Sequence, residues 1–279
     1  MYNSEVWGSY TKTDMKCLEI LDRQILKLIL GSHCKSQSEM LFLETGALPL
    51  EHILSIRRLG YFQTILKRDE KEVTKRIYRA QKKNPIPGDW VLLIEQDMIK
   101  YEIQLDEDQI ISMDAKSFKD MVKYNVRKRA FSELSTIQME HTKVQNIEYF
   151  GLHGPQKYLT SKLFNNKKRR LLYNLRCRSV NGIKDNFHRL YGDAIACPFL
   201  CLNQDDNQEH LLSCTTLTSK LSDTNLQLLL RVNYSHLFGT VIQQLDVTNM
   251  FLVLLGIRKR LLQTDQEPAC EGNNTRPDN

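Results

Sequence analysis

The chain has 279 residues, of which 41% are hydrophobic and 26% charged, and 39 basic against 33 acidic residues give a net charge of +6. This is the composition of an ordinary soluble protein, which excludes a collagen-like or wholly disordered chain and leaves room for one large domain or two smaller ones. The longest apolar run covers only seven residues, 251–257, whereas a membrane span needs about 20, and the first ten residues do not resemble a secretory signal.

Seven cysteines are present, an odd number, and only those at 197, 201 and 214 cluster. A disulfide framework favours an even count in a short secreted chain, so the cysteines indicate a reduced, intracellular protein. The sequence does not distinguish the nucleus from the cytoplasm.

Apolar residues recur with helical period along the first half of the chain. Residues 14–30 place Leu18, Leu21, Ile25, Leu28 and Ile29 at spacings of three and four, which predicts a helix with Cys17 on its apolar side and hence in the core. Further helices are expected from a capping box at Ser36 and Glu39, after Pro49, over 69–83, after Asp89 and over 114–141.

The second half continues in the same way, with helices expected over 165–178, 221–232 and 238–262. No run alternates apolar and polar residues as a strand would. The sequence therefore predicts a mainly α fold, an irregular multi-helix assembly with a small zinc-stabilised loop near residue 200. We expect four segments: 1–155, 156–217, 218–262, and a disordered tail over 263–279.

Charge is segregated along the chain. Residues 57–83 hold ten basic and three acidic residues (net +7), residues 84–121 hold three basic and nine acidic (net −6), and residues 157–178 hold eight basic residues and no acid (net +8). The first basic stretch is expected either to pair with the acidic one or to bind a partner.

The strongest local signal is the spacing Cys197-x3-Cys201-x8-His210-x3-Cys214. Three thiols and one imidazole are a complete tetrahedral ligand set for one structural zinc ion, with no position left open for a catalytic water. His210 and Cys214 are four residues apart and would share a helix face. Two alternatives stay open: chance clustering, and a different ligand set in which Cys177 or His188 replaces one member.

A basic run precedes this box, with aromatic residues Tyr173, Phe187 and Tyr191 interleaved. Cationic side chains neutralise phosphates and aromatic faces stack on unpaired bases, which favours nucleic acid, RNA or DNA, as a partner. The alternative is a solvated helix face. The candidate contacts are Lys167, Lys168, Arg169, Arg170, Arg176, Arg178, Lys184 and Arg189.

The order of several short motifs, Tyr2–Trp7, Leu43–Pro49, Arg57–Tyr61, Ala80–Lys82 and Gly88–Trp90, resembles the part of non-LTR (LINE-type) retrotransposon reverse transcriptases downstream of the polymerase palm. The resemblance covers residues 1 to about 217 and extends to the box, since the family often ends in a Cys-Cys-His-Cys motif. It implies a helical region that grips nucleic acid, with a retroelement polymerase or RNA–protein particle as a further partner. Neither a membrane nor a small-molecule substrate is implied.

No catalytic motif accompanies the resemblance. Its polymerases carry an aromatic-x-Asp-Asp turn between strands, whereas the adjacent pair here, Asp205-Asp206, has no aromatic before it and lies inside the box, where we expect a solvated loop. Phosphate-binding loops, nucleophile elbows and His-Glu-x-x-His are absent from the sequence, and the remaining histidines are dispersed. We therefore expect a non-enzymatic nucleic-acid-binding portion of a reverse transcriptase, with a helical protein-interaction module or a non-functional relic as alternatives.

Overall fold

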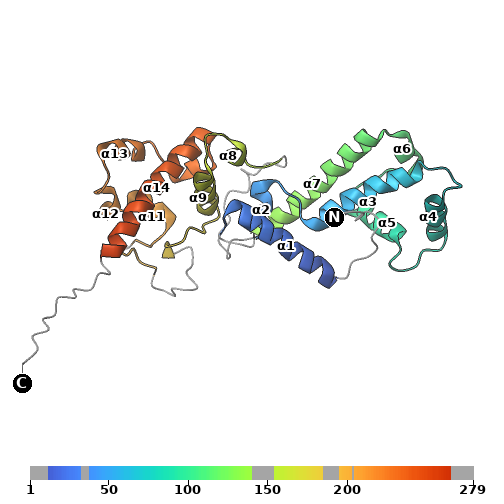
Figure 1. Cartoon of the computed structure of the whole chain (residues 1–279), viewed down its shortest axis with the longest axis horizontal. Helices are drawn as coiled ribbons and strands as arrows, with labels where there is room; N and C mark the ends of the chain where they lie inside the picture. The colour runs from blue at the N-terminus through green and yellow to red at the C-terminus, as the bar shows by residue number, and fades with distance from the viewer. Residues whose placement is uncertain (1–11, 33–37, 140–153, 185–194, 203, 265–279) are drawn as a thin grey trace, which may run out of the picture. The chain divides into compact units, whose positions relative to one another are not determined.

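The computed structural model describes residues 12–32, 38–139, 154–184, 195–202 and 204–264. Over these residues the chain is helical, without a strand, and only one isolated bridge joins Ala196 to Asp205. The prediction of a mainly α fold is thus confirmed. The chain divides into two compact units, residues 1–156 and 157–279 (Figure 1).

Seven helices form the described part of the first unit. They are α1 (Lys12–Leu30), α2 (Ser38–Thr45), α3 (Leu50–Leu66), α4 (Val73–Lys83), α5 (Trp90–Lys100), α6 (Glu107–Ser112) and α7 (Ala115–Met139). The long helices α3 and α7 lie side by side, and α5 and α6 pack against α3 (Figure 1). Leu59, Phe62, Phe118, Val122 and Val126 are almost wholly buried between these helices and form the centre of the core. Burial of this apolar surface is the main stabilising contribution to the unit.

Two sequence expectations fail in the first unit. Cys17 is exposed rather than buried, because α1 turns the side that carries Cys17, Leu21 and Leu28 to solvent. Helix α6 was not expected, although the sequence contains its start signal, since Asp106 and Gln109 form a reciprocal capping box.

A close approach of two glycines fixes the end of α2. Gly46 adopts a left-handed φ of +64°, and a Cβ atom at this position would lie 2.3 Å from the carbonyl carbon of Gly154. Nearby, Gln156 N donates to Glu44 O at 2.9 Å. Only glycine fits both the conformation and the space, so the chain following α2 depends on it.

The second unit is built around one long helix. Its elements are α8 (Lys157–Thr160), α9 (Asn166–Arg176), α11 (Gln208–Ser213), α12 (Thr215–Thr218), α13 (Asp223–Leu229), the 3-10 helix η3 (Tyr234–Phe238) and α14 (Val241–Thr264). All the others contact α14, whose residues Val247, Met250, Phe251 and Leu254 are fully buried. The described residues from 157 to 262, which the sequence divided at 217, thus share one core.

Two further features of α14 are its C-terminal end and its apolar composition. It continues to Thr264, so the expected tail is wrong for residues 263 and 264, and residues 265–279 lie outside the described part. By length and composition alone its stretch 241–263 could cross a membrane, a test that the core helix of a soluble protein also passes.

Candidate metal centre

The four residues of the box converge although they come from two different segments. Cys197 and Cys201 belong to a tight loop, in which Leu200 N donates to Cys197 O at 3.1 Å and Cys197 N donates to Gln204 O at 2.9 Å. His210 lies on α11, and Cys214 follows that helix directly. A helix at this place was expected from the spacing of His210 and Cys214. In the structure Asn207 caps it by accepting a hydrogen bond from His210 N at 2.7 Å.

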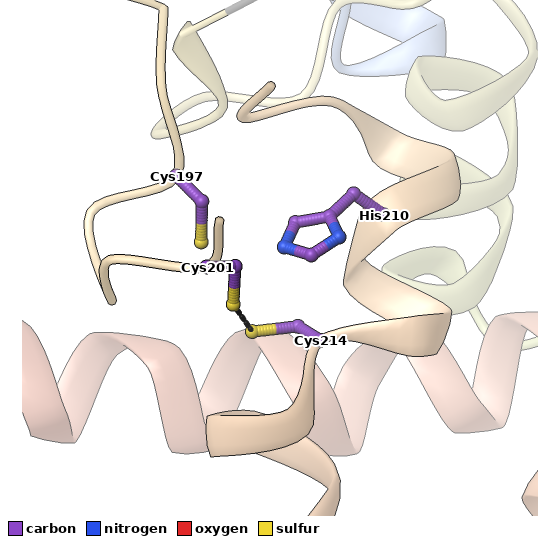
Figure 2. A group of neighbouring side chains, drawn as sticks. All are labelled: Cys197, Cys201, His210 and Cys214. Atoms are coloured by element: carbon purple, nitrogen blue, oxygen red, sulfur yellow. Dashed lines mark hydrogen bonds between the residues drawn. The ribbon is translucent and has the colours of Figure 1, made fainter. Parts of the chain in front are cut away.

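The distances between the ligand atoms suit one ion. All four atoms lie within 4.8 Å of one another, and Figure 2 shows the three sulfurs and the imidazole of His210 facing a common centre. The sulfurs of Cys201 and Cys214 are 3.7 Å apart. Two sulfurs that each lie about 2.3 Å from a tetrahedral zinc ion would be about 3.8 Å apart, so these side chains need little movement to bind one.

The burial of the group gives a second reason to expect an ion. Cys197, Cys214 and His210 are 4%, 0% and 6% exposed. Both ring nitrogens of His210 are buried and lack a hydrogen-bond partner among the described residues. A buried imidazole without partners is costly, and metal coordination would satisfy one nitrogen. The group can therefore hold a metal ion through four protein ligands.

The surroundings set the protonation of the metal-free ligands. Burial raises the pKa of Cys214 to about 12, and it also lowers the pKa of His210, against the attraction of Asp206. Burial acts to raise the pKa of Cys201 too, but hydrogen bonding with the thiols of Cys214 and Cys197 outweighs it and lowers this pKa. At neutral pH His210 is thus neutral and ready to bind, whereas Cys214 must lose a proton.

A buried ion pair anchors the box to α14. The Oδ2 atom of Asp206 accepts from Arg258 at 2.7 Å and from Lys184 N at 2.9 Å, and the two paired side chains are 1% and 5% exposed. The expectation of a solvated loop is therefore wrong for Asp206, although Asp205 is exposed. The sequence alone did not indicate this ion pair, because Arg258 lies on α14, 52 positions from Asp206.

Of the two replacement ligands considered from the sequence, the structure tests only Cys177. Cys177 is buried at the end of α9, outside the group whose ligand atoms converge. His188 lies outside the described residues.

Four of the candidate nucleic-acid contacts, Lys167 to Arg170, occupy the first turns of α9. Lys167 and Arg170 are exposed, and Lys168 and Arg169 are half-buried. Arg169 donates to Ser161 O at 2.8 Å and so holds the preceding loop against the helix. Within the described part of the chain, no ion pair joins any of the four to a carboxylate.

Arg176 does not belong to an accessible surface. It is 4% exposed, donates to Leu237 O at 2.8 Å and lies 4.6 Å from the ring centre of Phe238. Tyr173 is likewise fully buried. Both residues are therefore part of the core of the second unit, and their expected roles in binding and stacking do not fit the structure.

The remaining candidate contacts divide differently. Arg178 pairs with exposed Glu209 at 3.0 Å. Lys184 is half-buried, and its backbone supports Asp206. Arg189 lies outside the described residues, as do Phe187 and Tyr191.

The first basic stretch, by contrast, is largely paired with acids. Arg58 bonds Asp97 at 2.7 Å, and Arg79 bonds Glu107 at 2.9 Å. Lys82 also pairs with Glu107. Both acids belong to the acidic stretch 84–121, so the internal pairing considered from the sequence occurs.

A second cluster of titratable groups surrounds His52, which is 2% exposed. Ligand atoms of Glu51, His52 and Glu133 lie within 4.8 Å of one another, and His52 Nε2 is 3.4 Å from Glu133 Oε2. Lys100, however, bonds Glu51 and lies 3.9 Å from Glu133. Arg129 bonds Glu133 at 2.8 Å as well, so two cations neutralise the two carboxylates and the cluster is satisfied as an ion-pair network.

Comparisons with known proteins leave the chain without an assigned family. No protein-family model matches the sequence. No curated protein and no solved structure matches it either. Its function must therefore be argued from its own residues.

Proposed function

We propose that the chain is a non-catalytic nucleic-acid-binding protein whose second unit is held together by one structural zinc ion. By resemblance it corresponds to the C-terminal portion of a non-LTR retrotransposon reverse transcriptase. The observation that carries the proposal is the set of cations at the start of α9, in the same unit as the metal centre.

These cations sit where a helix least favours them. The first turn of α9 contains no acid, and the N-terminus of the helix is capped by Asn165, which accepts a hydrogen bond from Lys168 N at 2.9 Å. The exposed amide groups and the helix dipole already make this end positive, so four adjacent cations repel each other and the dipole. An anionic ligand relieves this repulsion, and a phosphate backbone supplies repeated anions at suitable spacing.

The choice of zinc follows from the donor set. Soft thiolates with one imidazole, in a closed four-ligand group, are typical of structural zinc rather than of magnesium or calcium, which prefer oxygen ligands. The ion would fasten the loop 197–204 to α11 and leave no open coordination position for catalysis. Asp206 would hold this assembly on α14 through Arg258.

The proposal is tested by binding of the zinc-loaded full chain to short single-stranded RNA and to duplex DNA, followed by fluorescence anisotropy. Between about 50 and about 200 mM salt, log K should fall linearly with log salt concentration. The variant Lys167→Gln/Lys168→Gln/Arg170→Gln should weaken binding, and it should reduce the slope by about 2 for single-stranded RNA and by about 3 for duplex DNA.

A matched control removes the same charge from the first unit. Lys83, Lys116 and Lys119 are exposed, and their replacement by glutamine should change binding much less. Equal effects of the two variants would refute the α9 surface. If the wild-type chain binds neither nucleic acid, the proposed function is wrong and the protein-interaction alternative is favoured.

A further inference from the structure

Helix α1 presents an apolar stripe to solvent. Ile20, Leu21, Ile25, Leu28 and Ile29 are 43%, 53%, 49%, 78% and 65% exposed. An amphipathic helix in a soluble protein normally turns such a stripe toward its own core. Here the described part of the chain leaves it uncovered.

The other side of α1 is covered within the first unit, where α1 contacts α2 and α3, and it holds both apolar and charged residues. Leu30 is 5% exposed and Leu26 is half-buried. Glu19, Asp22 and Arg23 are half-buried there, and Arg23 bonds Glu19 at 2.8 Å. Burial also raises the pKa of Asp22. Helix α1 is thus apolar on two sides, one packed within the unit at Leu26 and Leu30 and one turned to solvent at Leu21, Ile25 and Leu28, which the sequence had placed in the core.

The spacing of the stripe is that of a two-helix seam. Leu18, Leu21, Ile25 and Leu28 follow one another at intervals of three, four and three residues, which are the a and d positions of a heptad pattern. In this register Leu18 and Ile25 occupy the a positions, and Leu21 and Leu28 occupy the d positions. Isoleucine at a with leucine at d, the combination at Ile25 and Leu28, favours pairing of two helices. Such a stripe packs against another helix with a similar stripe, rather than against a flat surface or a sheet.

We propose that α1 pairs with α1 of a second copy of this chain. Four of the exposed side chains, Leu21, Ile25, Leu28 and Ile29, lie on or beside this seam and offer about 450 Å² of apolar surface per copy. Their burial removes about 900 Å² from water, the size of a weak, transient interface. The seam supplies its own complement, because both copies present the same residues.

The charge of α1 favours a second copy of this chain over an anionic partner. Helix α1 has four basic and three acidic residues, so its net charge of +1 neither repels a second copy strongly nor attracts a phosphate backbone or an anionic membrane. Membrane-binding helices are typically rich in Lys and Arg on the polar face. The inference concerns the first unit only and is independent of the metal centre and of the α9 surface.

Sedimentation equilibrium of the full chain tests the proposal. We expect a concentration-dependent dimer of twice the 32.6 kDa chain mass, with a Kd in the micromolar range. The variant Leu21→Glu/Leu28→Glu should weaken the dimer at least 100-fold without loss of helical circular dichroism, because both side chains are exposed. A wild-type chain that remains monomeric at the highest concentration overturns the proposal.

A control variant separates the stripe from general surface apolarity. Ile86 and Ile99 are 66% and 80% exposed and lie in the same unit outside α1, so Ile86→Glu/Ile99→Glu should leave the dimer unchanged. Equal weakening by both variants would overturn the assignment to α1.

Hydrogen exchange of the wild-type chain gives a reading that does not depend on any variant. Amides of α1 should exchange more slowly at high than at low protein concentration, while those of α5 should not change. Concentration-independent exchange in α1 would contradict the pairing.

Discussion

Replacement of Asp206 by alanine probes the link between the metal loop and the core of the second unit. In the native chain the carboxylate accepts from Arg258 at 2.7 Å, and both side chains are almost fully buried. The same guanidinium donates to Gly182 O at 2.7 Å. The substitution removes the charge partner and leaves Arg258 charged within the core.

The expected cost is large because an unpaired buried charge remains. Removal of one member of a buried pair costs about 3 to 5 kcal/mol. At about 1.4 kcal/mol per tenfold change, amides on α14 should exchange about 100- to 4,000-fold faster, if they exchange through opening of this unit. The segment between Cys201 on the loop and His210 on α11 should become less protected as well, and zinc affinity should fall.

Hydrogen exchange by mass spectrometry is the suitable assay because it reports on each unit separately. Both tryptophans, Trp7 and Trp90, lie in residues 1–156, so tryptophan fluorescence does not report on the second unit. The double variant Asp206→Leu/Arg258→Met serves as control, since it removes both charges and should cost less than about 2 kcal/mol. A single variant that changes exchange less than tenfold, or a double variant as damaging as the single one, would refute the reasoning.

Three further outcomes are expected. Gly46→Ala should destabilise the first unit by about 2 to 4 kcal/mol, because its Cβ would collide with Gly154. Gly60→Ala, on α3 with open space around it, should instead stabilise the unit by up to about 1 kcal/mol. Urea unfolding followed by tryptophan fluorescence compares the two variants. Leu200 is 90% exposed and adopts a left-handed φ of +59°, a conformation that favours glycine. Leu200→Gly should therefore stabilise the metal-loaded second unit by about 0.5 to 1 kcal/mol. The loop amides should then exchange hydrogen more slowly, and faster exchange would contradict the prediction. Zinc affinity should rise with pH between 6 and 8, because the raised pKa of Cys214 means that a proton competes with the ion. Competition with a chromophoric chelator measures the zinc affinity at each pH. A pH-independent affinity would exclude Cys214 as a ligand.

The parts of the molecule that local sequence signals determine were predicted well. The long helices carry clear 3.6-residue periods, and their expected ranges lie close to α3, α7, α9 and α14. The grouping of Cys197, Cys201, His210 and Cys214 was also expected, because one tight loop and one helical turn place these ligands within a short stretch of chain. A short helix such as α6 offered too few apolar positions for its period to be visible.

The orientation of elements and the burial of charge depend on distant residues and were not predicted. Periodicity identifies the apolar side of α1 but not whether a partner for it lies within the same chain. The sequence places Asp206 and Arg176 on the polar surface. In the structure Asp206 is buried against Arg258, and Arg176 against Leu237, each more than 50 positions away. A cationic run likewise does not reveal which of its members neighbouring helices will cover.

The metal content of the purified full chain tests the central claim most directly. Mass spectrometry under native conditions should find about one zinc ion per chain, and the variant Cys197→Ser/Cys201→Ser should lose it. Helices α11 and α14 should then exchange faster, while α3 and α7 of the other unit remain protected. A folded wild-type chain without bound zinc, even after zinc is supplied, would contradict the account.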